Sequence, residues 1–215
     1  MIFQLDTKEI SFPDPSYAED DGLLAVGGDL SAERLMLAYQ HGIFPWFNAE
    51  DPICWYAPHQ RFVLYPDQLK ITKSMQQLIR NSPFTVSHNQ AFEKVIKACA
   101  EIHRPDQHGT WISEEMQAAY IKLHNLGYAH SIEVWKDQEL VGGLYGVQVN
   151  QVFCGESMFS KLANTSKLAL IYLTQAFNFR LIDCQIESAH LRSLGAIFIS
   201  QEEFRTALKT SDVQL

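Results

Sequence analysis

The stretch HSIEVWKDQELVGGLYGVQVNQVFCGESM, residues 130–158, decides the fold. It contains three strand-like runs, at 130–135, 139–147 and 151–158, and only the short breaks KDQ and VN separate them. Short breaks between runs rich in β-branched and aromatic residues are typical of hairpins. The stretch therefore predicts three consecutive antiparallel strands, a meander.

Helices and further strands flank the predicted meander. Ser113 can cap a helix that runs to about Asn125, and Asn164 precedes an apolar helix over 165–177. Strands are also predicted at 61–65, 84–87 and 180–186, and helices at 31–40, 73–80 and 90–101. A meander followed by a crossing helix and another strand predicts an α+β fold with an acetyltransferase-like (GNAT-like) mixed sheet and flanking helices.

The N-terminal part differs from the rest in composition. GIFPWF (42–47) and PICWYAP (52–58) are dense in aromatics and proline, and proline disfavours both helix and central strand. We therefore predict that these aromatic residues lie on rigid loops, where they form either a small core of their own or a platform for a flat ligand. The composition changes near Arg61, which predicts a small N-terminal domain (1–62) and a catalytic domain (63–215).

Composition excludes several classes of protein. The chain has 215 residues, 47% of them apolar, and a formal net charge of −8, which argues against broad coating of nucleic acid. The cysteines (54, 99, 154 and 184) form no C-x-x-C pair, and the histidines form no HExxH pair or zinc-like cluster, so free thiols and no metal are expected. No signal peptide is evident, and no apolar run reaches the roughly 20 residues of a membrane span, so a cytoplasmic protein is expected.

Polar residues interrupt two of the predicted strands. Strict alternation places Leu181, Asp183 and Gln185 on one face of the strand 180–186, opposite Ile182, Cys184 and Ile186. It also places Val152, Cys154, Glu156 and Met158 on one face of the strand 151–158, opposite Phe153, Gly155 and Ser157. The two polar faces indicate a mostly apolar pocket with a few polar contacts. The alternative is that Asp183 and Gln185 only cap a neighbouring loop at a strand end.

Motifs for covalent catalysis and for coenzyme A are missing. There is no G-x-S-x-G elbow, and a nucleophilic Cys154 or Cys184 would need a base that the sequence does not identify. An acetyltransferase-like fold should carry a glycine-rich phosphate loop before the crossing helix, but SKLANTSK (160–167) contains no glycine. The run GGLYG (142–146) lies within a predicted strand and indicates close backbone approach instead. An acyl donor other than acyl-coenzyme A is therefore expected.

Along nearly its whole length the sequence resembles the leucyl/phenylalanyl-tRNA–protein transferases. The resemblance is carried by GLLAVGGDLSAERLMLAYQHGIFPWF (22–47), GTWIS (109–113), HSIEVW (130–135), LVGGLYGV (140–147), FCGESMFS (153–160), LIDCQ (181–185) and HLRSLGA (190–196). It implies an enzyme that moves Leu or Phe, and possibly Met, from aminoacyl-tRNA to the N-terminal Arg or Lys of a protein and so marks that protein for degradation. It implies no cofactor, no membrane and a monomer.

The resemblance also implies roles for individual residues. Asp183 and Gln185 would be the catalytic pair, Glu156 would pair with the cationic acceptor N-terminus, and Trp46 and Trp111 would stack on the terminal adenosine. The pocket for the donor side chain would be formed by Leu144, Met158, Leu170, Leu173, Phe177 and Ile182, with ordinary core packing as the alternative for several of them. A weak tRNA patch is predicted at Lys70, Lys73 and Arg80, with simple solvation as the alternative.

Two rival classes of protein remain open. One is an acetyl-coenzyme A-dependent N-acetyltransferase, against which the absent glycine loop argues. The other is a non-catalytic reader of basic N-termini that uses Glu156 as its anion. A reader would bind an Arg-starting peptide without transferring any group to it.

Overall fold

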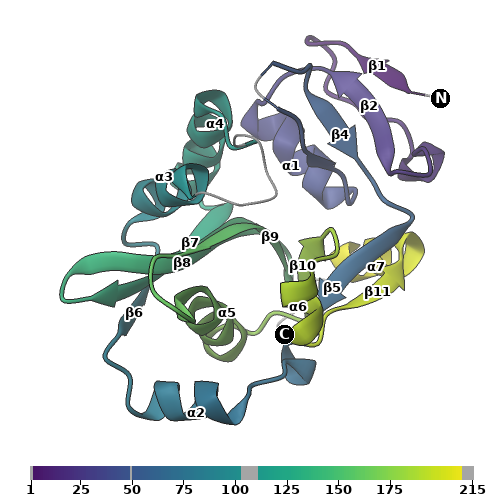
Figure 1. Cartoon of the computed structure of the whole chain (residues 1–215). Helices are drawn as coiled ribbons and strands as arrows, with labels where there is room; N and C mark the ends of the chain where they lie inside the picture. Colours follow the sequence, from purple (N-terminus) through teal and green to yellow (C-terminus); the bar gives the residue numbers. More distant parts are fainter. Residues whose placement is uncertain (1, 49, 103–110, 210–215) are drawn as a thin grey trace, which may run out of the picture.

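The computed structural model describes the chain except for residues 1, 49, 103–110 and 210–215, and its strands form two sheets (Figure 1). The strands are β1 (Phe3–Leu5), β2 (Leu23–Gly27), β3 (Phe44–Pro45), β4 (Cys54–Tyr56), β5 (Gln60–Leu64), β6 (Thr85–His88), β7 (Ala129–Lys136), β8 (Glu139–Val149), β9 (Val152–Ser160), β10 (Leu181–Gln185) and β11 (Ile197–Ser200). The helices are η1 (Pro15–Tyr17), α1 (Ala32–Gln40), η2 (Pro66–Gln68), α2 (Lys73–Arg80), α3 (Phe92–Glu101), α4 (Glu114–Asn125), α5 (Thr165–Ala176), α6 (Ala189–Ser193) and α7 (Gln201–Lys209).

The larger sheet contains the predicted meander. Its strand order is β11-β5-β10-β9-β8-β7-β6, and β7, β8 and β9 pair antiparallel while β10 runs parallel to β9. Helix α5 covers one face of this sheet, and α3 and α4 cover the other (Figure 1). The α+β class is confirmed, with the crossing helix and the following strand where the sequence predicts them.

Side-chain caps explain where the predicted helices begin. The hydroxyl oxygens of Ser31, Thr72 and Ser113 accept hydrogen bonds from backbone N–H groups in the first turns of α1, α2 and α4, respectively. Such caps satisfy donors that a helix start leaves unpaired. Gly42, in the left-handed region at φ +78°, follows α1 and allows the chain to turn into β3.

The prediction that both aromatic stretches are loops is wrong. Strand β4 lies inside the smaller sheet, whose order is β1-β2-β4-β3, and it pairs with both β2 and β3. Pro52 and Pro58 flank β4 without interrupting it, and Pro45 lies in the edge strand β3, so the prolines break no internal ladder. Trp55 of β4 is fully buried in the large core.

Close packing between α5 and the sheet explains one glycine of the GGLYG run. A Cβ at Gly142 would meet the side chain of Thr165, at the start of α5, and the Thr165 hydroxyl donates to the carbonyl of Val141 at 3.0 Å. The interpretation of this run as a site of close backbone approach is confirmed. It lets the helix lie directly against β8.

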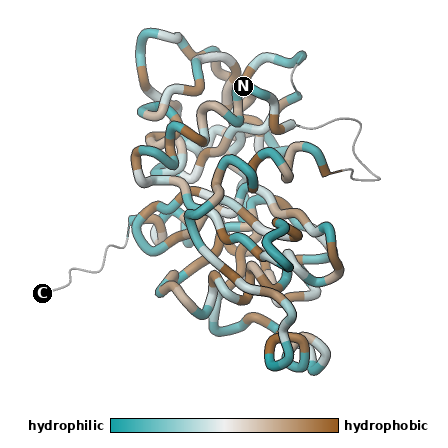
Figure 2. The backbone as a smooth tube through the Cα atoms, turned by 90° about the vertical axis from the view of Figure 1, so that its left-hand side faces the viewer, coloured by the Kyte–Doolittle hydropathy of each residue, from teal (hydrophilic) through white to brown (hydrophobic). Residues whose placement is uncertain are grey.

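Two apolar clusters fill the two faces of the larger sheet. The first joins the smaller sheet to α3 and α4, and the second packs α5 and α2 against the opposite face. In Figure 2 the hydrophobic segments lie mainly inside the molecule and the hydrophilic ones at its outer turns. Strand β5 spans the boundary predicted at residue 62, and the two-domain division stays a prediction.

The cysteines, the lengths of the helices and several short elements complete the description of the fold. All four cysteines are free thiols, with Cys99 and Cys154 buried. Among the described residues, every helix is too short or too polar to cross a bilayer. Strands β1 and β11 and helices α6 and α7 are additions to the predicted elements.

Candidate active site

The candidate site lies where β9 and β10 diverge. The two strands pair in parallel from Val152 and Leu181 as far as Cys154 and Asp183, and each then becomes irregular. In β9, Gly155 and Ser157 pair with consecutive residues of β8, which leaves Glu156 as the extra residue of a bulge. Bulges bend a strand and re-aim side chains, so this one turns Glu156 towards β10.

Strand β10 carries a second irregularity opposite the first. Its register against β5 shifts between Asp183 and Gln185, and Gln185 adopts a left-handed backbone at φ +59°. A non-glycine residue in this region is uncommon and often marks a functional site. The Asp183 carboxylate holds the turn by accepting from the Gln185 backbone N–H at 2.8 Å.

These bulges overturn part of the predicted alternation. Cys154 packs in the core beneath α3 and α4 and does not line the main cavity, whereas Met158 packs with the core on the α5 side. The prediction that Cys154, Glu156 and Met158 share a face is wrong because the extra residue inverts the pattern. For the same reason Gln185 does not simply continue the face of Asp183.

Asp183 is fully buried and forms an ion pair that sequence reasoning missed. Arg61 Nε and Nη2 donate to Oδ1 and Oδ2 of Asp183 at 2.8 and 2.7 Å, a two-pronged geometry. Burial disfavours the charge of Arg61, but the adjacent carboxylate outweighs burial and raises the pKa of the guanidinium. Arg61 opens a predicted strand, and nothing in its sequence context distinguishes it from an exposed strand-end arginine.

Aromatic rings from both ends of the chain enclose this ion pair. The Arg61 guanidinium lies 4.5 Å from the ring centroid of Phe44 in β3 and 4.6 Å from that of Phe204 in α7. It also donates to the Gly42 carbonyl at 3.2 Å. Asp183 therefore has its oxygens occupied by protein donors.

Glu156 and Gln185 meet across the fork. Gln185 Nε2 donates to Glu156 Oε1 at 2.6 Å, and the Tyr120 hydroxyl donates to Glu156 Oε2 at 3.0 Å. Tyr120 in turn contacts the hydroxyl of Tyr39, and both tyrosines are buried. Burial raises the pKa of Glu156 to about 7, although the hydrogen bonds from Tyr39, Tyr120 and Gln185 lower it in part.

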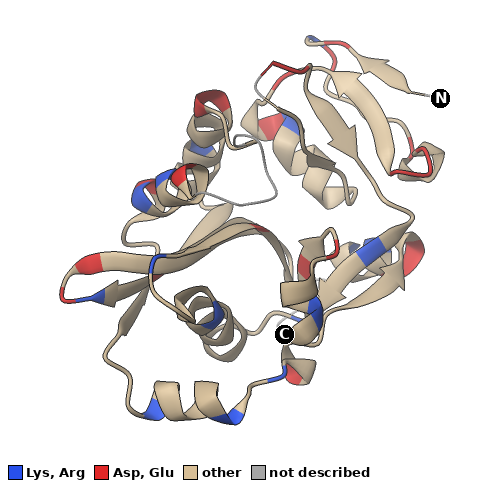
Figure 3. Ribbon diagram, viewed as in Figure 1, with Lys and Arg blue, Asp and Glu red and all other residues tan. Residues whose placement is uncertain are grey.

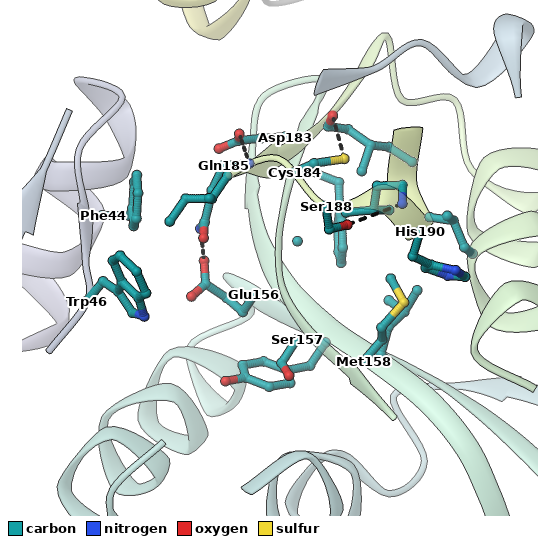
Figure 4. A pocket seen from close by; sticks show the side chains of 18 of the residues that line it. Phe44, Trp46, Glu156, Ser157, Met158, Asp183, Cys184, Gln185, Ser188 and His190 are labelled. Atoms are coloured by element: carbon teal, nitrogen blue, oxygen red, sulfur yellow. Dashed lines mark hydrogen bonds between the residues drawn. The ribbon is translucent and has the colours of Figure 1, made fainter. Parts of the chain in front are cut away.

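A cavity of about 360 Å³ opens at this fork (Figure 4). Its size lies within the range of small-molecule sites. Its lining includes most of the predicted site residues: Trp46, Trp111, Leu144, Glu156, Met158, Leu170, Leu173, Ile182, Asp183 and Gln185. Trp111 belongs to the GTWIS block, of which residues 109 and 110 lie outside the described part of the chain.

One predicted lining residue lies elsewhere. Phe177 lines a separate, smaller cavity, where its ring packs edge-on against His88 at 5.4 Å between centroids. Its place just after α5 turns it away from the fork, so the structure does not place it in the main cavity. His190 of α6 does line the main cavity, and its Nε2 is buried without a hydrogen-bond partner among the described residues.

The aromatic side chains form one end of the cavity. Figure 4 shows Phe44 and Trp46 on the side of Glu156 and Gln185, with Met158 and His190 on the opposite side. Trp46 is 40% exposed, and its ring packs edge-on against Tyr56 at 5.6 Å between centroids. A half-exposed indole held from behind can accept a flat ring on its free face.

The start of α5 lacks a free phosphate cradle. The N–H of Ser166, in the first turn of α5, is occupied by the Ser160 hydroxyl at 2.9 Å. Backbone N–H groups at a helix start bind phosphate when they are free. This geometry agrees with the absence of glycine from the loop.

The predicted basic residues lie apart from the cavity. Lys70, Lys73 and Arg80, here called the α2 cluster, lie on or near α2, and none of them lines the main cavity. Figure 3 shows basic positions at both ends of α2, on the outer edge of the molecule. The α2 segment contains no acid, so this surface is locally cationic in an acidic protein.

A mixed sheet forks over an apolar cavity with an amide–carboxylate pair in its lining, the arrangement of a small-molecule site. Residues 63–209 match the family described as leucyl/phenylalanyl-tRNA protein transferase, and residues 28–59 match its N-terminal domain. The chain belongs to this family.

Relatives at high identity agree with this assignment. The leucyl/phenylalanyl-tRNA–protein transferase of Hydrogenovibrio crunogenus is 57% identical over 212 residues, covering 96% of this chain and 83% of the relative. That of Flavobacterium johnsoniae is 52% identical over 206 residues, covering 94% of this chain and 97% of the relative. Among solved structures, a GCN5-related N-acetyltransferase from Kribbella flavida aligns with a TM-score of 0.37 and 9% identity, over 75% of this chain and 58% of that one.

Proposed function

We propose that the chain transfers a leucyl or phenylalanyl group from aminoacyl-tRNA to the N-terminal Arg or Lys of an acceptor protein, as a cytoplasmic monomer, and so marks that protein for degradation. The observation that carries the proposal is the single cavity that joins an apolar wall, two indoles and the Gln185–Glu156 pair. In the reaction the α-amine attacks the ester carbonyl, a C–N bond forms, and the ribose hydroxyl leaves. The ester is already activated, so no protein nucleophile is required.

The apolar wall suits the donor side chain. Leu144, Leu170 and Ile182 line it from three different elements, and Met158 adds an adaptable thioether. A wall of this kind discriminates by shape and size, at about 1–3 kcal/mol per methylene. We therefore propose graded selectivity, with γ-branched and unbranched apolar donors preferred to β-branched ones.

The indoles suit the terminal adenosine of the donor. Trp46 and Trp111 both line the cavity. Stacking of a base on an aromatic side chain contributes about 1–3 kcal/mol and needs no phosphate. The α2 cluster would add contacts to tRNA phosphates outside the cavity.

The two members of the predicted catalytic pair differ in what they can reach. Gln185 can present its amide oxygen to the attacking amine, because its amide nitrogen is engaged by Glu156. Asp183 is buried against Arg61 and acts through Gln185, whose left-handed backbone it holds. In this proposal Gln185 is catalytic, Asp183 is a positioning residue, and Glu156 pairs with the acceptor cation.

A transfer assay tests the proposal against its rivals. Phe-tRNA should donate to an Arg-starting peptide and fail with an Ala-starting one, and labelled acetyl-coenzyme A should donate to neither. Gln185→Ala should abolish most of the transfer, whereas Gln148→Ala, at an exposed glutamine of β8 outside the main cavity, should retain it. Peptide binding without transfer would identify a reader of basic N-termini and refute the enzyme.

A further inference from the structure

The attacking nitrogen loses two protons in this reaction, and few groups in the cavity can carry one of them. The α-ammonium must lose a proton before it can attack, the nitrogen loses a second as it becomes an amide, and the ribose oxygen must gain one as it leaves. Among the described residues, the carboxylates and the imidazole lining the cavity are those of Glu156, Asp183, Glu187 and His190. Tyr145 and Cys184 also line it, but phenols and thiols ordinarily titrate above neutral pH, and burial raises the pKa of Cys184 further. Gln185 can accept a hydrogen bond but, as a neutral amide, is not a base near neutral pH.

Two of these groups are already engaged by arginines. Asp183 is fully buried, and Arg61 and the Gln185 backbone occupy its oxygens. Glu187 is exposed at the rim and pairs with Arg192, whose guanidinium contacts its carboxylate. Asp183 is therefore shielded by protein donors, and Arg192 holds Glu187 at the rim. Glu156 and His190 remain.

Glu156 lies directly beside the group that orients the amine. Its Oε1 accepts from Gln185 Nε2 at 2.6 Å, so a nucleophile bound to the Gln185 amide oxygen lies next to the Glu156 carboxylate. A carboxylate has about four lone-pair positions, and Gln185, Tyr120 and Tyr39 use three of them, so Glu156 can accept one further bond. The bulge in β9 exists at this residue, which places the side chain at the fork.

The surroundings of Glu156 suit reversible proton exchange. The groups facing it are Tyr39 of α1, Tyr120 of α4, and Gln185 and Asp183 of β10, with Arg61 of β5 behind Asp183. Burial raises the pKa of Glu156 to about 7, whereas the ordinary value is 4.5. An α-ammonium has a pKa of about 7.7–8.0, so transfer to Glu156 is unfavourable by only about tenfold, against more than a thousandfold for an ordinary carboxylate.

We propose that Glu156 is the general base and acid of the transfer, taking the proton from the acceptor α-ammonium and giving it to the departing ribose oxygen. This inference rests on the proposed transfer reaction and assigns its proton carrier. The neutral amine forms the C–N bond and the C–O bond breaks. The proton returned by Glu156 completes the ribose hydroxyl, and the second proton that the nitrogen loses on becoming an amide passes to solvent. No other reactant is consumed.

His190 is the alternative base, and its position disfavours it. Burial and the nearby charge of Lys167 lower the pKa of His190. Figure 4 shows His190 beside Met158, on the far side of the cavity from Gln185. A base must lie within hydrogen-bond reach of the proton that it removes.

The first test compares acceptors at a fixed pH. Single-turnover transfer from Phe-tRNA is measured at saturating acceptor for wild type and Glu156→Gln, which keeps the shape and removes the basic oxygen. The acceptors are an Arg-starting peptide and its α-aminooxy analogue, whose nucleophile is already neutral at pH 7. The expected losses are at least about 100-fold for the amine and under about tenfold for the aminooxy acceptor.

The second test follows the pH profile of the same step. Tyr120→Phe removes a hydrogen bond that lowers the pKa of Glu156, so the acid limb of the profile should move to higher pH. Tyr172→Phe and Glu133→Gln, both outside the main cavity, are the controls and should retain the wild-type limb. His190→Asn should also leave the position of the limb unchanged.

The outcomes separate this inference from the proposed function. Two results would overturn the role of Glu156 while wild type still transfers. One is an equal loss of rate for both acceptors in Glu156→Gln. The other is an acid limb of the pH–rate profile that moves in His190→Asn but stays in place in Tyr120→Phe. A change in KM for the acceptor with unchanged kcat in Glu156→Gln would show that Glu156 only binds the acceptor cation, and would also overturn its role in proton transfer. No transfer by wild type at any pH would overturn the proposed function itself.

Discussion

Replacing Asp183 by Asn should destabilise the whole protein, because it leaves a buried guanidinium without its anion. The side chains of Arg61 and Asp183 are 2% and 0% exposed, and two hydrogen bonds join them. Removing one partner of a buried pair typically costs about 3–5 kcal/mol. Since domains of this kind are stable by roughly 5–15 kcal/mol, the loss is a large fraction of the total. It corresponds to a fall in Tm of roughly 6–20 °C for a chain of this size.

Urea unfolding followed by circular dichroism measures this effect. Asp183→Asn and Arg61→Met should each lower the midpoint at a similar m-value, and the double variant should lose less than the sum of the two. Glu101→Gln is the control, because the Lys97–Glu101 pair is exposed and contributes under about 1 kcal/mol. A wild-type midpoint for Asp183→Asn, or strict additivity in the double variant, would refute the reasoning. The activity of any Asp183 variant should therefore be measured at a temperature at which that variant is still folded.

Three other expectations can be checked with standard measurements. Because the pKa of Glu156 rises from 4.5 to about 7 on folding, the folded state binds an extra proton between these values, so stability should fall as pH rises through them. Between pH 4.5 and pH 8, the free energy of unfolding from urea titrations should fall by roughly 3 kcal/mol more in wild type than in Glu156→Gln. The same pH dependence in both proteins would contradict this expectation. In filter binding of Phe-tRNA, neutralising the α2 cluster should make the slope of log K against log salt shallower by about 0.7–0.9 per lost phosphate contact. Trp46→Ala should instead weaken binding at every salt concentration and leave the slope unchanged. Gly142→Ala should lower the free energy of unfolding by about 1–3 kcal/mol, because the added methyl group meets Thr165. An unchanged urea midpoint would show that α5 can move away.

The helices and the meander could be predicted because local chemistry determines them. Ser113 forms the cap expected of it, and β7 and β8 are mostly buried, as in a sheet covered on both faces. Gly142 also behaves as its strand context indicates. For the cap and the meander the deciding contacts lie within the element or with its neighbour in the chain, whereas Gly142 meets α5, which follows β8 after β9.

The two bulges could not be predicted from alternation. A bulge adds one residue without a sequence mark of its own, so Cys154 and Met158, predicted on one face, pack on opposite faces of the sheet. The pairing of Arg61 with Asp183 joins positions far apart in the sequence, and only the tertiary fold brings them together. Strand β4 was missed because the prolines that flank it look like interruptions when the pairing of the strand is unknown.

The enclosure of Arg61 between Phe44 and Phe204 ties the site to the order in which the ribosome makes the chain. Phe44 is synthesised early, but Phe204 lies in the last described helix, next to β11, which pairs with β5. Domains fold as units, N-terminal parts first during synthesis, so the aromatic surroundings of Arg61 are complete only after Phe204 has been made. The ion pair that holds the catalytic strand therefore depends on residues made 160 positions apart, from Phe44 to Phe204.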